Sequence, residues 1–237
     1  WNAGGEWIPP KHASKSLYFS KVNVRGAKNT QEINIPFPTL RDKDDRGRNI
    51  IIEYDDAGRP AYYKEVAIVA VPKHDGTVYP DISQILNLTE YLDSENNILI
   101  WDAPKGNWEV YRYIVANSGR QVVLPSENSW GPIIDHYDAD AMEFHVNYFI
   151  NRLSTVIDDI EESALSYLYL ASYEARGFSW TTVLPETFKN QHGYDVYKFL
   201  PSLHIQDSFV QSGYPEDDVA QGFLYDFNQT ISEMMIN

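Results

Sequence analysis

The sequence predicts a mixed α+β or α/β fold, in which an antiparallel β-sandwich, jelly-roll-like, is inserted into a partial (β/α)-barrel. Three observations predict it. Residues 15–125 hold short apolar or alternating runs separated by turn-forming residues, which is typical of antiparallel sandwiches. From about residue 138 the apolar spacing becomes helical, and the nearly uncharged run 164–171 then has the character of a strand in a parallel sheet.

The order of these zones indicates an insertion. Residues 1–14 are rich in glycine and proline and form a predicted loop that leads into the barrel. Residues 15–125 form the predicted sandwich, including a hairpin in which Trp101 and Trp108 flank a Pro/Gly turn. Cross-strand aromatic pairs stabilise such turns, so we expect the two rings to act as a structural clamp.

Residues 126–237 form the predicted α/β barrel segment. A helix is expected over 138–161, with Asp140 as N-cap and Glu143 completing a capping box. A strand over 164–171 follows, and helical spacing returns in the C-terminal part of the chain.

Composition limits the functional classes. The chain of 237 residues carries a formal net charge of −15, which repels nucleic acid and anionic membrane surfaces. No cysteine is present, so disulfides and thiolate metal sites are excluded. The apolar runs are strand-sized, which predicts no membrane insertion. Because the chain opens at Trp1 with neither Met nor a signal peptide, we expect it to be a piece of a longer polypeptide.

The most informative residue is Glu174, which directly follows the predicted strand and lies close in sequence to Tyr173 and Trp180. Active sites of parallel α/β folds are built at the carboxyl ends of strands. Aromatic neighbours desolvate a carboxylic acid and favour its neutral form, which a glycosidase needs in its general acid. Spacing alone leaves a surface salt bridge with Arg176 equally open.

Six motifs occur in order along the chain. They are Trp1 with Gly4-Gly5-x-Trp7, the strand 65–72, the hairpin 101–108, the helix 138–153, Ala171-Ser172-Tyr173-Glu174, and His192-Gly193-Tyr194-Asp195 with its flanking helices. No single motif is specific, but the ordered set resembles glycoside hydrolase family 106, the α-L-rhamnosidases, along nearly the whole chain.

The resemblance implies that Glu174 is the catalytic acid of an inverting hydrolysis of terminal α-L-rhamnosyl linkages in plant or microbial polysaccharides. The second carboxylate of such a pair, and most metal ligands, are expected beyond residue 237. The family uses calcium and no organic cofactor, and its members act outside the cytoplasm, in the periplasm or after secretion. Trp7, Asp135, Tyr173 and Trp180 are expected to line the sugar pocket.

Two departures weaken this expectation. Where the family has Gly-Leu-Glu before Asp-Lys, this chain has Pro132-Ile133-Ile134 before Asp135-His136, and Ala171 replaces the first Asp of the catalytic motif. A non-catalytic alternative therefore stays open: a carbohydrate-binding or structural sandwich, with Trp101 and Trp108 as candidate sugar contacts.

Two further assignments also have competing interpretations. Asp135, His136, Asp138 and Asp140 could hold a divalent cation, although acids that cap a loop-to-helix junction explain the cluster more simply. Trp7 could stack on a sugar or be buried under the inserted domain.

Overall fold

The computed structural model describes residues 3–27, 29–44, 47–73, 81–123, 125, 127, 129–157, 159–160, 162–164, 179–203 and 218–235. The chain divides into two compact units. Unit 1 comprises Trp1–Ser16, Arg41–Tyr63 and Ala116–Thr181, and unit 2 comprises Leu17–Leu40, Lys64–Val115 and Thr182–Asn237. The helices after residue 182 belong to the same unit as most strands of the two sheets, and the domain boundaries at residues 15 and 126 stay predictions.

Helices and antiparallel sheets occur together, which confirms the mixed α and β prediction. The larger sheet has the order β4 (Leu86–Asn87), β3 (Tyr63–Pro72), β7 (Asn107–Asn117), β1 (Lys15–Arg25) and β8 (Ser179–Trp180). The smaller has the order β2 (Gln31–Asn34), β6 (Ile98–Trp101) and β5 (Leu92–Asp93). The pairs β1–β8, β3–β4, β2–β6 and β5–β6 are antiparallel.

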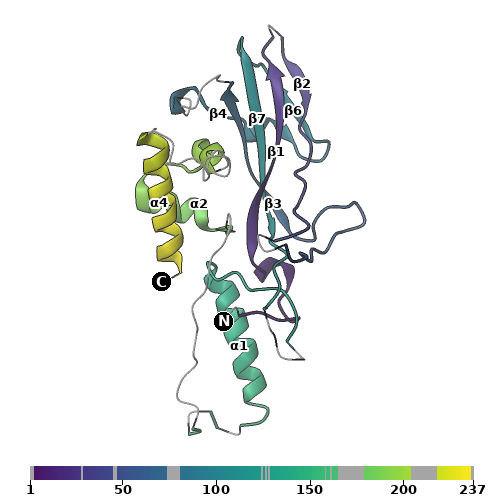
Figure 1. Cartoon of the computed structure of the whole chain (residues 1–237), viewed down its shortest axis with the longest axis vertical. Helices are drawn as coiled ribbons and strands as arrows, with labels where there is room; N and C mark the ends of the chain where they lie inside the picture. The colour runs from purple at the N-terminus through teal and green to yellow at the C-terminus, as the bar shows by residue number, and fades with distance from the viewer. Residues whose placement is uncertain are drawn as a thin grey trace. The chain divides into compact units, whose positions relative to one another are not determined.

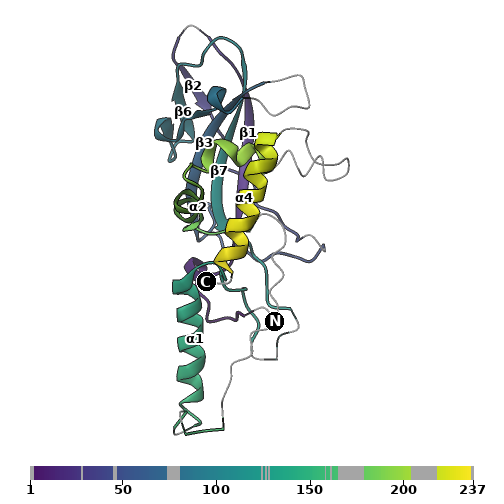
Figure 2. The ribbon, with the colours of Figure 1, turned by 90° about the vertical axis from the view of Figure 1, so that its left-hand side faces the viewer.

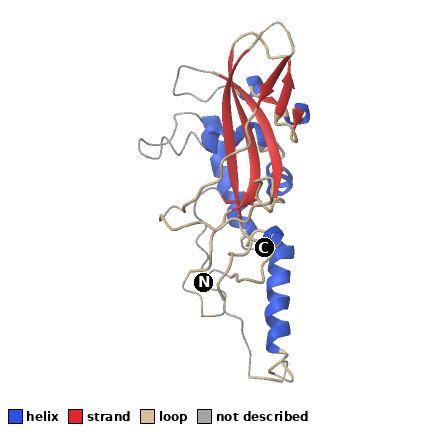
Figure 3. Ribbon diagram, turned by 90° about the vertical axis from the view of Figure 1, so that its right-hand side faces the viewer, coloured by secondary structure: helices blue, strands red, loops and turns tan. Residues whose placement is uncertain are grey.

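The core of unit 2 lies between the two sheets. Ile68 and Val110 from the larger sheet and Leu99 from the smaller one are fully buried in a single apolar cluster. Side chains alternate between the two faces of a strand, so each sheet can present an apolar face to this core. Figure 3 shows the strands in front of the helices of this unit.

The predicted contact between Trp101 and Trp108 is confirmed, but the predicted hairpin is wrong. Trp101 is the last residue of β6 in the smaller sheet and Trp108 lies on β7 in the larger sheet, so the rings meet between the two sheets. Trp101 and Trp108 meet edge to face, with ring centroids 5.4 Å apart and an interplanar angle of 79°. Both rings are buried in the core between the sheets. The Trp108 indole N–H also donates to the Pro104 carbonyl at 2.8 Å, which satisfies its one polar group.

An arginine is also buried in unit 2. Arg112 on β7 is fully buried, and its Nη1 donates to the Ile35 carbonyl at 3.1 Å and to Asn97 Oδ1 at 2.7 Å. Its Nε and Nη2 contact the Glu65 carboxylate, and the guanidinium lies 5.3 Å from the Phe37 ring centroid. A buried charge is tolerated only when it is paired and hydrogen-bonded in this way.

Helices α2 (Leu184–His192) and α4 (Asp218–Met234) pack together in unit 2. Figures 1 and 2 show them on one side of the β4–β3–β7–β1 part of the sheet. Pro185 occupies the first turn of α2, and Gly193 ends the helix in the left-handed conformation at φ 78°, an arrangement that proline and glycine favour at these positions. Phe188 and Phe223 are buried where the helices meet.

Four short 3-10 helices complete the described elements: η1 (Pro10–His12), η2 (Ile82–Gln84), η3 (Thr89–Tyr91) and η4 (Tyr197–Phe199). No helix among the described residues is both long and apolar enough to cross a membrane.

Helix α1 (Ala139–Leu153) of unit 1 confirms the predicted helix but corrects its ends. Asp138, rather than Asp140, is the N-cap, and its side chain accepts from the Asp140 N–H. The helix ends at Leu153, short of residue 161, where the Ser154 hydroxyl donates back to the Asn151 carbonyl at 2.9 Å. Serine side chains compete in this way with continued helix formation. The predicted strand 164–171 lies, from residue 165 onward, outside the described residues.

Candidate functional site

Three of the five predicted site residues can be placed. Trp7, Asp135 and Trp180 are described and belong to unit 1. Glu174 and Tyr173 fall in the stretch 165–178, which lies outside the described residues, so their roles stay predictions. The site is therefore built from the surroundings of the other three.

The segment 132–135 runs between two parts of the N-terminal loop. On one side the Gly5 N–H donates to the Pro132 carbonyl at 3.1 Å, and on the other the Ser14 N–H donates to the Ile133 carbonyl at 2.7 Å. The next residue continues this ladder, since the Asp135 N–H donates to the His12 carbonyl at 2.8 Å. These bonds hold the backbone of Asp135 in place.

Glycines make this close approach feasible. A Cβ on Gly4 would lie 2.2 Å from the Pro132 carbonyl oxygen, and a Cβ on Gly131 would lie 2.1 Å from the Gly5 carbonyl carbon. A Cβ on Gly5 would lie 2.3 Å from the Trp7 ring. The Gly-Gly-x-Trp motif thus has a packing reason, because any larger residue would push the paired segments apart.

Asp135 forms a buried ion pair with Lys15, the first residue of β1. Lys15 Nζ lies 2.8 Å from Asp135 Oδ2, and the two side chains are 0% and 1% exposed. The same Nζ donates to the Ala13 carbonyl at 3.2 Å, and Asp135 Oδ1 accepts from the Tyr137 N–H at 3.2 Å. Burial raises the pKa of Asp135, while the Lys15 ammonium opposes that rise.

Trp180 lies opposite the same lysine. Strand β8 pairs with the start of β1 so that Trp180 faces Lys15 and Ser179 faces Ser16. Trp180 is 1% exposed, so its side chain is buried. The structure therefore brings Asp135 and Trp180 to the same lysine, and their assignment to a sugar pocket stays a prediction.

Trp7 packs on helix α1. Its ring stacks on Tyr148 with centroids 4.6 Å apart and an angle of 9°, and lies nearly parallel to the His145 ring at 5.9 Å. Its indole N–H donates to His145 Nδ1 at 3.3 Å. The ring is half-buried, and α1 rather than the β-sandwich accounts for the packing described here.

Three histidines surround these residues, and burial lowers the pKa of each of them. For His136 the pKa falls to about 4, because burial dominates over its hydrogen bond to the Ile134 carbonyl. Burial likewise lowers the pKa of His12, which stacks on Phe144, and of His145. All three are therefore neutral at neutral pH.

The acidic cluster at the start of α1 does not form a cation site in the described residues. Asp138 caps the helix and Asp135 is bound to Lys15, which supports the capping interpretation. Within the described ranges, no group of three or more His, Asp or Glu side chains gathers where a metal ion could be held.

Sequence reasoning missed Lys15 as a member of this site. Nothing in the sequence around Lys15 distinguishes it from an ordinary strand residue, because its ion-pair partner, Asp135, lies 120 positions away. The resulting surroundings have aromatic rings, neutral histidines and a neutralised ion pair. Such surroundings suit a neutral, partly apolar ligand, and acid–base chemistry would need a further carboxyl group.

Comparisons with known proteins agree with one another. The model of glycoside hydrolase family 106, described as alpha-L-rhamnosidase, matches residues 72–237. A protein of Formosa agariphila named "Putative beta-glucuronidase" is 23% identical over 99% of this chain. The structure of a rhamnosidase from Novosphingobium sp. PP1Y matches 99% of this chain with a TM-score of 0.65 at 14% identity, a likeness of fold. This chain spans 20% of the first protein and 36% of the second.

Proposed function

Because the chain belongs to glycoside hydrolase family 106, we propose that it serves the hydrolysis of terminal α-L-rhamnosyl bonds in oligosaccharides or polysaccharides. The observation that carries the proposal is the family match over residues 72–237, since this stretch includes Glu174 and most of the ordered motifs.

In the proposed reaction Glu174 is the general acid. Its carboxyl group donates a proton to the glycosidic oxygen as the bond to the anomeric carbon breaks. A second carboxylate takes a proton from the water that attacks the opposite face of the sugar, so the anomeric configuration inverts. Inverting pairs stand roughly 6.5–9.5 Å apart, which leaves room for that water. The proposal assigns one member of the pair to this chain.

Charge favours a rhamnosyl over a glucuronyl substrate. The two relatives carry the names of enzymes for a neutral and for an anionic sugar. A net charge of −15 repels an anionic uronate and does not repel a neutral sugar. The neutral histidines and the Lys15–Asp135 pair add no uncompensated positive charge that would bind a uronate.

The finer architecture belongs to the same proposal. We take unit 1 to contain part of a (β/α)-barrel and the sheets of unit 2 to form the inserted jelly-roll sandwich. The apolar core shared by the two sheets supports the sandwich. The calcium ion that the resemblance implies stays part of the proposal, with most of its ligands expected beyond residue 237. The described residues alone offer no group of three or more His, Asp or Glu side chains that could hold it. Because polymeric glycans remain outside the cytoplasmic membrane, we propose a periplasmic or secreted site of action.

The test is the activity of the full-length protein on an aryl α-L-rhamnoside. Glu174→Gln keeps the shape but cannot donate the proton, so turnover should fall by about 10²–10⁴-fold. Glu90→Gln, an exposed glutamate on η3, is the control and should act like the unchanged protein. NMR of the first-formed sugar should show the inverted anomer. Unchanged turnover in Glu174→Gln would reject the assignment.

The alternative is a non-catalytic module. Sugar binding through Trp101 and Trp108 is disfavoured, because both rings are buried between the sheets. The packed core instead favours a structural role for unit 2. Full-length protein that is folded but inactive on every aryl glycoside tested would support this alternative.

A further inference from the structure

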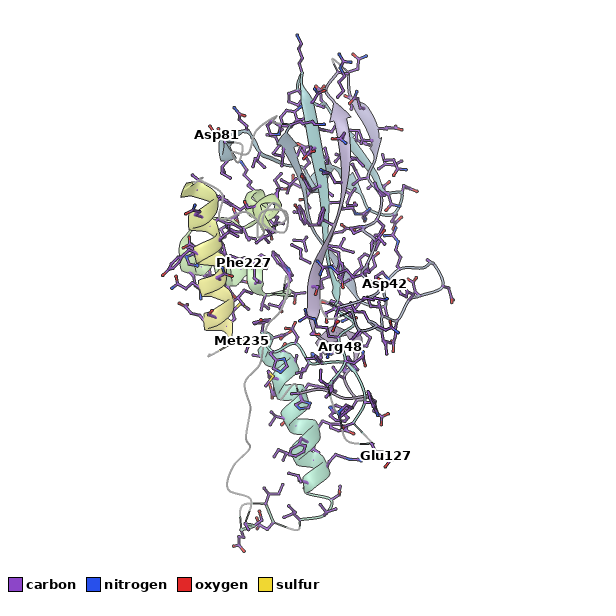
Figure 4. All side chains as sticks on the ribbon, in the orientation of Figure 1. Asp42, Arg48, Asp81, Glu127, Phe227 and Met235 are labelled. Carbon is purple, nitrogen blue, oxygen red and sulfur yellow. The ribbon has the colours of Figure 1, made fainter. Side chains whose placement is uncertain are left out.

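Unit 2 contains a pocket whose lining includes none of the predicted site residues. Its volume is about 660 Å³, within the range of small-molecule sites. The lining residues are Ile82, Asn87, Tyr194, Asp195, Tyr197, Lys198, Phe199, Val219, Gly222, Phe223 and Asp226. Asp81 and Phe227, labelled in Figure 4, are the sequence neighbours of Ile82 and Asp226.

One face of α4 forms a wall of this pocket. Val219, Gly222, Phe223 and Asp226 recur at the spacing that places side chains on a single helical face. Tyr194, between α2 and η4, and Tyr197 and Phe199, in η4 itself, supply three aromatic rings.

Gly222 has no packing reason to be glycine among the described residues. It lies inside α4 with an ordinary helical φ, and a Cβ built on it would have no atom within 4 Å. Glycine is, after proline, the least favourable residue in a helix interior. By contrast, Gly4, Gly5 and Gly131 are each explained by a neighbouring atom closer than 3 Å. At Gly222 the open space itself lies in the pocket.

Two of the polar side chains that line the pocket, Asp195 and Asp226, are carboxylates that accept hydrogen bonds. Asp226 Oδ2 accepts from the Tyr194 hydroxyl at 2.8 Å, which fixes the carboxylate at the pocket wall. Asp195 also lines the pocket, and its Oδ1 lies 3.1 Å from Lys189 Nζ. Carboxylates beside aromatic rings suit a ligand that carries both hydroxyl donors and apolar C–H faces.

We propose that this pocket binds a neutral pyranose ring of a glycan. The C–H face of the sugar stacks on Tyr197, a hydroxyl donates to Asp226, and the ring edge occupies the space above Gly222. Lys198 also lines the pocket and Lys189 pairs with Asp195, so these groups together give no excess of positive charge over the carboxylates of Asp195 and Asp226 that would favour an anionic sugar. The inference stands whether or not the chain takes part in hydrolysis.

The test measures binding of methyl α-L-rhamnopyranoside, methyl β-D-glucopyranoside and methyl α-D-galactopyranoside to the 237-residue chain by calorimetry and ligand-observed NMR. At least one should bind, and glucuronate should bind more weakly. Gly222→Leu fills the pocket and should lower affinity at least about tenfold, yet leucine favours the helix, so the melting temperature should not fall.

Asn228→Leu is the matched control, since it adds the same side chain at an exposed α4 position outside the pocket. It should bind like the unchanged chain. Tyr197→Ala is a second variant and should also weaken binding. The proposal is overturned if no neutral pyranoside binds, if Gly222→Leu binds like Asn228→Leu, or if Tyr197→Ala leaves affinity unchanged.

Discussion

The Lys15 ammonium and the Asp135 carboxylate form an ion pair of 2.8 Å in which neither side chain is more than 1% exposed. The two residues lie 120 positions apart, and the pair ties the first residue of β1 to the segment before α1. Replacing one partner of a buried ion pair leaves the other charge buried without a counter-charge, whereas replacing both partners leaves no buried charge.

Asp135→Leu should therefore lower the free energy of unfolding by about 3–5 kcal/mol. The double variant Lys15→Met with Asp135→Leu should lose clearly less, because no charge remains unpaired. Urea denaturation measures all three proteins. Lys189→Met is the control, since the Lys189–Asp195 pair is exposed and should contribute less than about 1 kcal/mol. Equal losses in the single and double variants would mean that the pair is not coupled.

Gly4→Ala should destabilise unit 1, because the new Cβ would lie 2.2 Å from the Pro132 carbonyl oxygen, a backbone atom. Overpacking of this kind costs about 1–3 kcal/mol. Gly58→Ala offers a comparison, since its Cβ would meet nothing within 4 Å and only the backbone at φ 73° is strained. Thermal unfolding should rank Gly4→Ala below Gly58→Ala, and the opposite order would show that the loop adapts.

His136 should make the folded state sensitive to mild acid. Burial lowers its folded-state pKa from 6.5 to about 4, so between these values the unfolded chain binds the proton more readily. Its contribution to stability is complete above pH 6.5 and is lost as the pH falls toward 4, by on the order of 3 kcal/mol. His136→Asn should remove this part of the pH dependence of unfolding in urea. If the free energy of unfolding depends on pH in the same way in His136→Asn and in the unchanged protein, His136 does not cause this acid sensitivity.

Arg112→Met should destabilise unit 2 more than any exposed substitution. It leaves the Ile35 carbonyl and Asn97 Oδ1 without this donor and Glu65 without its partner. We expect a loss of about 3–5 kcal/mol. Arg112→Lys keeps the charge but not the planar fork, so it should restore only part of the loss. Full restoration by lysine would show that charge alone matters.

The sequence predicted features that depend on local spacing. The Trp101–Trp108 contact is confirmed, because the short Pro/Gly turn keeps the two residues close in space. The predicted hairpin is wrong, since the strands that carry them, β6 and β7, belong to different sheets. The apolar spacing also predicted helix α1, but the predicted N-cap, Asp140, is wrong. Both Asp138 and Asp140 are residues that can cap a helix, and only the fold shows that Asp138 does so.

Long-range polar contacts left no local pattern to find. Lys15 and Arg112 occupy strands and look like exposed strand residues in the sequence, yet both are buried. Their partners are set by how strands and loops assemble, which alternation of apolar and polar residues does not encode. Glu174 and Tyr173, in turn, lie outside the described residues, so the catalytic part of the prediction stays a prediction.

The edge-to-face indoles of Trp101 and Trp108, 5.4 Å apart in the core of unit 2, have a spectroscopic consequence. Two chromophores this close couple their electronic transitions, so circular dichroism should contain an exciton couplet that disappears when the sheets separate. Trp7, in unit 1, stacks instead on a tyrosine. Separation of the two sheets of unit 2 can therefore be followed optically, without a label.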